Sequence, residues 1–145
     1  MEAHLILRRP SSDGSSHEIL FGRRRNTGYA DGVFHLPSGH LEADESITDA
    51  LIRESFEEVG INPAPEQVRF SHVMHRSCNG GRMSYFFAVD SYEGEPVNNE
   101  PHKCSELAWF RADALPDNML DYCQRALFYI TKDSHFSTYT CNRCC

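Results

Sequence analysis

The sequence predicts an α/β fold built around a mixed β-sheet, and two observations predict it. Short apolar segments with strand character are interspersed with two segments whose apolar residues recur at helical spacing. The chain of 145 residues is 40% hydrophobic and 24% charged, which is the balance of an ordinary globular domain. We therefore expect a single domain over residues 1–145, in which helices pack on a sheet.

Five segments are predicted to be strands because they are rich in β-branched or aromatic residues or alternate in polarity. They are residues 4–7, 18–21, 68–74, 82–90 and 107–110. Loops rich in Gly, Pro, Ser, Asp or Asn at 10–16 and 93–101 separate some of these strands. Apolar residues spaced as on one face of a helix predict helices over 47–59 and 119–130.

The formal net charge of −7 is concentrated in one segment. Residues 39–60 hold seven acidic residues and one basic residue, and the rest of the chain has a net charge of −1. Duplex nucleic acid requires a basic face, so this distribution excludes that partner and favours a cation site. No apolar run approaches the roughly 20 residues that a membrane span requires, and we expect no membrane partner. Since no secretory signal is visible, we expect a cytoplasmic location.

The six cysteines have no spacing that predicts a disulfide framework. Three of them lie in the last five residues of the chain, at Cys141, Cys144 and Cys145. We expect free thiols there, on a C-terminal tail that is frayed over residues 134–145.

The segment 44–61 has clear helix boundaries but an unusual pattern inside them. Ser46 is placed as the N-terminal cap, with Asp49 three residues later, and Gly60 is placed as a left-handed C-terminal cap. At about 100° per residue, one stripe is apolar at Ile47, Ala50 and Leu51 and then acidic at Glu54, Glu57 and Glu58. A second apolar stripe, Ile52, Phe56 and Val59, predicts that the helix is covered on two faces.

Carboxylates spaced three and four residues apart repel one another, and partial burial makes their ionisation costly. A hard divalent cation would compensate for this, because magnesium prefers oxygen ligands. The alternative is a solvated acidic face, and the helix alone does not decide between the two.

The sequence from Gly39 reads GHLEADESITDALIRESFEEVGI and resembles the Nudix box over residues 39–61. The positions that carry the resemblance are Gly39, Glu45, Arg53-Glu54, Glu57-Glu58 and Gly60. Two positions depart from the usual pattern: Ser55 stands at an apolar position, and Ser38 stands where many relatives have a second glycine. Segments 26–37 and 100–110 also resemble small MutT-like members of the family. The resemblance implies a Nudix-type α/β/α sandwich around a mixed β-sheet.

This resemblance implies metal-dependent hydrolysis of a nucleoside diphosphate linked to a group X. The small domain favours a (deoxy)nucleoside triphosphate, cleaved to monophosphate and pyrophosphate by water attack at phosphorus. The implied cofactor is Mg²⁺, with Mn²⁺ as a substitute. The implied metal ligands are Glu54, Glu57 and Glu58, with Ser38 contributing its carbonyl oxygen and Glu100 as a further ligand or base. Glu54 or Glu57 would take the proton from water, and Arg53 would pair with Glu45 or Glu54 to hold the carboxylates.

Four further residues are candidates for contacting the substrate. Arg23 and Arg25 come from a basic cluster at a strand end, and the others are His40 and Arg76. The expected partner is a small-molecule nucleotide, and a homodimer is left open. Two alternatives remain: hydrolysis of ADP-ribose, a nucleotide sugar or a dinucleoside polyphosphate, or a non-catalytic Nudix module that binds a nucleotide.

Overall fold

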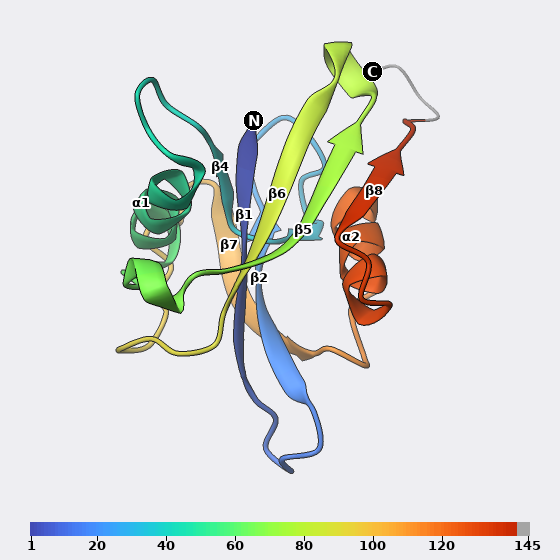
Figure 1. Cartoon of the computed structure of the whole chain (residues 1–145). Coiled ribbons are helices and arrows are strands. Elements are labelled where there is room, and N and C mark those ends of the chain that lie inside the picture. Colours follow the sequence, from blue (N-terminus) through green and yellow to red (C-terminus); the bar gives the residue numbers. More distant parts are fainter. Residues whose placement is uncertain (142–145) are drawn as a thin grey trace.

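The computed structural model describes residues 1–141, apart from the side chain of Asn79, and it confirms the α/β fold (Figure 1). Its strands are β1 (Glu2–Pro10), β2 (His17–Arg24), β3 (Phe34–His35), β4 (Ser38–His40), β5 (Arg69–Arg76), β6 (Arg82–Val89), β7 (Cys104–Arg111) and β8 (Phe136–Tyr139). Its helices are α1 (Ile47–Val59) and α2 (Asp121–Thr131), with short 3₁₀ turns η1 (Pro65–Gln67) and η2 (Cys78–Gly80). None of the helices in residues 1–141 has the length and apolar character to cross a membrane.

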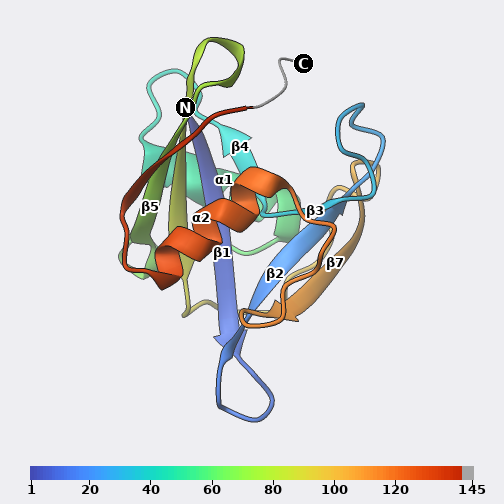
Figure 2. The same ribbon diagram turned by 90° about the vertical axis from the view of Figure 1, so that its right-hand side faces the viewer.

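The described strands form one mixed sheet in the order β3-β2-β1-β6-β5-β8, with β4 paired to β1 and β7 paired to β2. Helices α1 and α2 lie on opposite sides of this sheet, which gives a three-layer sandwich (Figures 1 and 2). Strand β1 is central: it runs parallel to β6 and antiparallel to β2 and β4.

Alternation along β1 supplies both layers of the core. Leu5 and Leu7 pack with buried residues of α1, whereas Ile6 packs with buried residues of α2. Successive side chains of a strand point to opposite faces, so a strand covered on both sides is apolar throughout. Residues 5–7 of β1 therefore form a continuous apolar run rather than an alternating pattern.

Helix α1 has the predicted bounds and the predicted caps. The Ser46 hydroxyl accepts a hydrogen bond from the Asp49 amide, and Gly60 has a φ of 71° and donates its amide to the carbonyl of Phe56. Ser55 is buried, and its hydroxyl donates to the Leu51 carbonyl at 2.8 Å, which satisfies a polar group at a usually apolar position. The prediction of a covered second stripe is wrong at Phe56, whose side chain is 58% exposed.

The five predicted strands are confirmed, and most of them extend beyond their predicted ends. Helix α2 begins at Asp121 rather than at residue 119, because Met119 forms an isolated bridge with Phe34. Three strands were not predicted. They are β3, β4 and β8, and none is longer than four residues. Segments so short carry too little pattern to be identified from sequence.

The C-terminal segment corrects the expectation of a frayed tail with free thiols. Strand β8 pairs in parallel with β5, and Cys141 forms a disulfide with Cys78, with Cα atoms 5.7 Å apart. The buried His72 of β5 adds two contacts: its Nδ1 donates to the Ser134 carbonyl and its Nε2 accepts from the Ser137 hydroxyl, each at 2.7 Å. Cys144 and Cys145 lie outside the described residues.

Removal of this disulfide by Cys78→Ser should destabilise the fold. The bond joins residues 63 apart in sequence, and closing such a loop contributes about 4 kcal/mol through the entropy of the unfolded chain. We expect Tm to fall by roughly 10 °C in a thermal melt under oxidising conditions. Dithiothreitol should lower Tm of the wild type by a similar amount and leave the variant unchanged. Equal responses of both proteins to the reductant would contradict the pairing.

Candidate active site

The acidic half of α1 is packed against β4. The amide of Ser38 donates a hydrogen bond to Oε2 of Glu58 at 3.0 Å. The carboxyl group of Glu54 lies against the backbone of Gly39, where a Cβ atom would overlap it. Glu57 points outward, and its side chain is 49% exposed. The helix thus directs two carboxylates toward the sheet and leaves the third accessible to water.

Arg53 connects the acidic residues around this helix. Its Nε and Nη2 donate to the two carboxylate oxygens of Glu45, at 2.7 and 3.1 Å. Its Nη1 donates to Glu54 at 2.8 Å and to Glu57 at 3.3 Å, and Nη2 also donates to the His40 carbonyl at 3.0 Å. The N–H groups of this one guanidinium thus hold the carboxylates of Glu54 and Glu57 in place relative to β4.

Burial raises the pKa of the Glu58 carboxyl well above its ordinary value, and the neighbouring carboxylates of Glu54 and Glu100 raise it further. The Ser38 amide and the Lys103 ammonium oppose this rise without cancelling it. Burial also raises the pKa of Glu54, against the lowering effect of Arg53. Negative charge is therefore concentrated in a partly dry environment, where a further positive charge would be strongly favoured.

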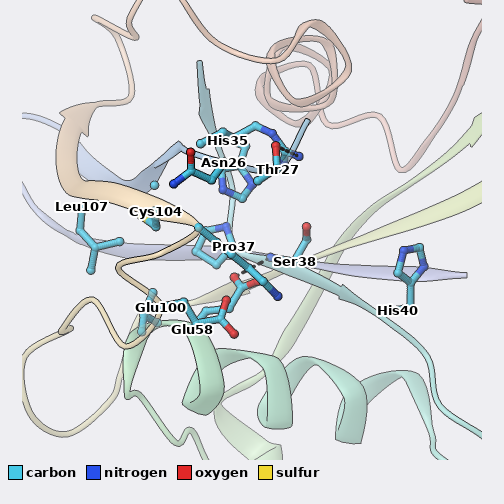
Figure 3. A pocket seen from close by; sticks show the side chains of 14 residues that line it. Asn26, Thr27, His35, Pro37, Ser38, His40, Glu58, Glu100, Cys104 and Leu107 are labelled. Atoms are coloured by element: carbon cyan, nitrogen blue, oxygen red, sulfur yellow. Dashed lines mark hydrogen bonds between the residues drawn. The ribbon is translucent and has the colours of Figure 1, made fainter. Parts of the chain in front are cut away.

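A cavity of about 490 Å³ opens beside these carboxylates (Figure 3). Its walls come from β2, β3, β4, β7, the end of α1 and the loops at 26–27 and 100–103. The lining residues are Gly22, Arg24, Asn26, Thr27, His35, Pro37, Ser38, His40, Glu58, Val59, Glu100, Lys103, Cys104 and Leu107. A volume of this size is typical of sites for small organic ligands.

The predicted site residues are distributed unequally around this cavity. Ser38, His40, Glu58 and Glu100 line it, and Glu100 comes from the loop that precedes β7. Glu54, Glu57, Glu45 and Arg53 form the network on the adjoining face of α1. His40 lines the end of the cavity remote from Leu107, with an exposed side chain (Figure 3).

Three predicted substrate contacts lie elsewhere. Arg23 donates to the Gly32 carbonyl and lies over the ring of Phe34, on the α2 side of the sheet. Arg25 is exposed, and its Nη1 is 3.5 Å from the carbonyl oxygen of Pro101.

Arg76 belongs to a different polar cluster, under α2. Its Nη2 donates to Glu2 at 2.6 Å, and its guanidinium lies 3.9 Å from the centre of the Tyr122 ring. Arg82 donates to the same carboxylate at 2.8 Å. The neighbouring His4 is fully buried, and burial lowers its pKa to about 3, so it is neutral near pH 7. Arg76 is thus bound within the protein and does not line the cavity.

Sequence reasoning did not select Arg24 from its basic cluster and missed Lys103 and His35, and all three residues line the cavity. The signal for Arg24 was present, because residues 20, 22 and 24 of β2 share one face and Leu20 packs toward α1. Arg23 falls on the other face by the same rule, and Arg25 lies one residue beyond the end of β2. Arg24 is held by the Tyr29 carbonyl at 2.9 Å and the Thr27 hydroxyl at 3.1 Å.

The oxygen donors of this site fit a hard divalent cation in their chemistry. Glu54, Glu57, Glu58 and Glu100 supply carboxylates, and Ser38 supplies a carbonyl, which are the ligand types that Mg²⁺ prefers. The buried carboxyl of Glu58, with a single amide donor on it, is a group that a cation would satisfy. Within residues 1–141, however, no three acidic, histidine or cysteine side chains are gathered closely enough to hold a metal. Arg53 instead engages two of the carboxylates.

In the metal-free protein, the contribution of Glu54 and Glu58 to the free energy of unfolding should fall as pH rises. Their folded-state pKa values are raised above 4.5, so their stabilising contribution is complete below about pH 4.5 and is lost as pH rises through the folded pKa. Glu58→Gln removes the buried charge and should raise Tm at pH 8 by roughly 2–4 °C in the presence of a chelator. The gain should be absent at pH 4.5.

The matched control is Glu66→Gln, at an exposed position in η1, which should leave Tm unchanged at both pH values. A lower Tm for Glu58→Gln at pH 8 would show that the buried charge is already compensated within the protein.

Comparison with known proteins identifies the family. The model of the NUDIX domain matches residues 4–128. An 8-oxo-dGTP diphosphatase of Escherichia coli K12 is 29% identical over 103 residues, which cover 70% of this chain and 79% of that protein. A putative 8-oxo-dGTP diphosphatase of Mycobacterium tuberculosis is 28% identical over 117 residues, 79% of this chain, which spans about half (54%) of that relative's length.

Among solved structures, a MutT NUDIX hydrolase from Burkholderia pseudomallei superposes with a TM-score of 0.69 at 25% sequence identity. The match covers 87% of this chain and 96% of that one. The glutamates on α1, the cavity beside them and these likenesses agree on one assignment. The chain belongs to the Nudix hydrolase family, as a small MutT-like member that hydrolyses a nucleoside diphosphate linked to another group.

Proposed function

We propose that this protein hydrolyses a (deoxy)nucleoside triphosphate to the monophosphate and pyrophosphate, with Mg²⁺ as its cofactor and Mn²⁺ as a substitute. The observation that carries the proposal is the cavity that has the partly buried Glu58 and the facing Glu100 in its wall. A site with this negative charge binds a polyphosphate only together with cations. The E. coli relative, named for a nucleoside triphosphate substrate, supports the choice of substrate class.

In this proposal some side chains bind the cation, and Glu54 or Glu57 also accepts the proton of the attacking water. Glu54, Glu57, Glu58, Glu100 and the Ser38 carbonyl would hold the cation. When bound, a divalent cation offsets phosphate charge and makes water more acidic. Glu54 and Glu57 are the candidate general bases, and they differ in setting: Glu57 is open to solvent, whereas Glu54 is enclosed between Arg53 and Gly39.

Positive groups on the cavity wall would orient the phosphates. Lys103 and Arg24 are the positive groups that line the cavity, and the imidazole ring of His40 lies at its exposed end. Lys103 is close enough to Glu58 to lower the pKa of that carboxyl, so it can reach a phosphate held near the same place. Arg53 and Glu45 act as positioning residues because they hold Glu54 and Glu57 without lining the cavity themselves.

The proposed substrate suggests a cellular location for the protein. We propose a cytoplasmic location, where nucleoside triphosphates are abundant, and in a reducing cytosol the Cys78–Cys141 pair would exist largely as thiols. A homodimer also remains a proposal, to be tested by sedimentation.

A hydrolysis screen with Mg²⁺ and then Mn²⁺ tests the proposed function. The panel contains canonical and oxidised nucleoside triphosphates, ADP-ribose, a nucleotide sugar and a dinucleoside polyphosphate, and product masses identify the broken bond. We expect monophosphate and pyrophosphate from a triphosphate, and a loss in kcat of roughly 10²–10⁴-fold for whichever of Glu54→Gln and Glu57→Gln removes the base. Glu66→Gln is the matched control.

Two outcomes would overturn the proposal. Preference for ADP-ribose, a nucleotide sugar or a dinucleotide would keep the hydrolytic mechanism and replace the substrate. Nucleotide binding without turnover, with either metal and folded protein, would support a non-catalytic module.

Gly39→Ala should disable the site without unfolding the protein. The added methyl group would overlap the Glu54 carboxyl and displace it from β4. Because a misplaced ligand typically costs 10–100-fold, we expect kcat/KM and the apparent affinity for Mg²⁺ to fall by about that factor. Circular dichroism and Tm check the fold. Unchanged metal affinity in a correctly folded variant would show that the position of Glu54 against Gly39 is not needed.

A further inference from the structure

The loop that precedes β7 is attached to the C-terminal turn of α1. The amide of Val97 donates to the Val59 carbonyl at 2.9 Å, and the amide of Asn99 donates to the Glu58 carbonyl at 3.1 Å. The side-chain amide of Asn99 also donates to the Phe56 carbonyl at 3.2 Å. These bonds supply donors to carbonyl groups at the end of the helix, and they hold the loop against the turn that carries Glu58.

A tight turn in this loop then brings an ammonium group to the same wall as two carboxylates. The amides of Lys103 and Cys104 both donate to the Glu100 carbonyl at 2.9 Å. Asn98 closes the turn, because its side chain accepts from the Glu100 amide at 3.2 Å and donates to the Cys104 carbonyl at 2.8 Å. Glu58, Glu100 and Lys103 all line the cavity, and Figure 3 shows the first two side chains next to each other.

The Lys103 side chain is free to change partners. Lys103 is exposed, and within residues 1–141 no ion pair or hydrogen bond holds its ammonium group. Arg24, the other cation of the cavity wall, is instead bound by Tyr29 and Thr27. Because the lysine stem is flexible, its charge can move between nearby anions without breaking a fixed contact.

Two kinds of anion compete for this ammonium group when a nucleotide is present. In the empty site the nearest anions are carboxylates, and Lys103 is close enough to Glu58 to lower the pKa of that carboxyl. A positive charge there repels a divalent cation that approaches the same carboxylates. A bound polyphosphate attracts the ammonium group to itself, and this leaves the carboxylates to the cation.

We propose that Lys103 couples cation binding to nucleotide binding: it opposes a divalent cation in the empty site and binds a phosphate when a nucleotide is present. The proposal rests on the proposed function, because it places the phosphates beside Glu58 and Glu100. The free protein would then bind the cation weakly, and the protein with nucleotide would bind it strongly. Lys103 therefore acts in opposite directions on the two ligands, which a residue that only supports the fold would not do.

The test measures both ligands without turnover. Binding of Mn²⁺ is titrated by electron paramagnetic resonance, with and without α,β-methylene analogues of ATP, GTP, CTP and UTP, and the metal held by free analogue is subtracted. The variants are Lys103→Met, which removes the charge and keeps the length of the side chain, and Lys103→Arg, which keeps the charge. Lys132→Met is the matched control, since Lys132 is the other lysine of the chain and caps α2 away from the cavity.

Lys103→Met should tighten Mn²⁺ binding to the free protein by roughly three- to tenfold, because one nearby positive charge is lost. It should weaken binding of the preferred analogue in the presence of Mn²⁺ by roughly tenfold, the effect of one lost charged hydrogen bond. The factor by which the analogue raises Mn²⁺ affinity should fall accordingly. Lys103→Arg should retain most of this factor, and Lys132→Met should leave both affinities unchanged. Equal Tm values would show that the variants are folded.

Three results would overturn the proposal. They are unchanged or weaker Mn²⁺ binding to free Lys103→Met, an unchanged effect of the analogue on Mn²⁺ affinity in that variant, or equal changes in Lys132→Met. These results are distinct from failure of the proposed function. Coupling that depends on Lys103 without hydrolysis of any triphosphate would remove only the triphosphatase activity, and hydrolysis with coupling indifferent to Lys103 would remove only the role of this lysine.

Discussion

The packing of the acidic end of α1 against β4 is the constraint on which the site depends. Two carboxylates are directed at a strand whose backbone offers Glu58 one amide and offers Glu54 only the open space at Gly39. The last turn of α1 contains no basic residue, so Glu57 and Glu58 also lie at the negative end of the helix dipole. The helix dipole therefore destabilises the carboxylates that cation binding requires at this end of α1.

Apolar burial holds this arrangement in place. Ala50, Leu51 and Val59 are buried on the same helix and anchor it to the core below. Strand β4 is in turn paired to β1, which is shared by both layers of the sandwich. Burial of apolar side chains contributes about 25 cal/mol per Å², enough over several residues to offset the repulsion among a few carboxylates. Arg53 supplies the remaining compensation, and it does so from outside the cavity, where it leaves room for a ligand.

Local patterns in the sequence were sufficient for α1 and its two caps. The caps at Ser46 and Gly60 and the 3.6-residue period are contained within one segment, so no distant contact is needed to recognise them. Strands β3, β4 and β8 exist only because longer strands pair with them, and their sequences do not show this. Arg24, which lines the cavity, was not chosen for another reason, since strand alternation was available and places Arg23 and Arg24 on opposite faces, whereas Arg25 lies beyond the end of β2. The pairing of Cys78 with Cys141 depends on β8 lying beside β5, which no local pattern shows.

The disulfide also adds a covalent connection between the two walls of the cavity. It closes a covalent ring from Cys78 to Cys141 that contains β6, β7, α2, β8 and the loop bearing Glu100, whereas α1 and β4 lie outside it. In the oxidised protein, a protease that cut the exposed loop at 93–95 would therefore break one peptide bond without releasing a fragment. The wall that carries Glu100 would stay tethered to the wall that carries Glu58, and the two halves would separate only after reduction of the ring.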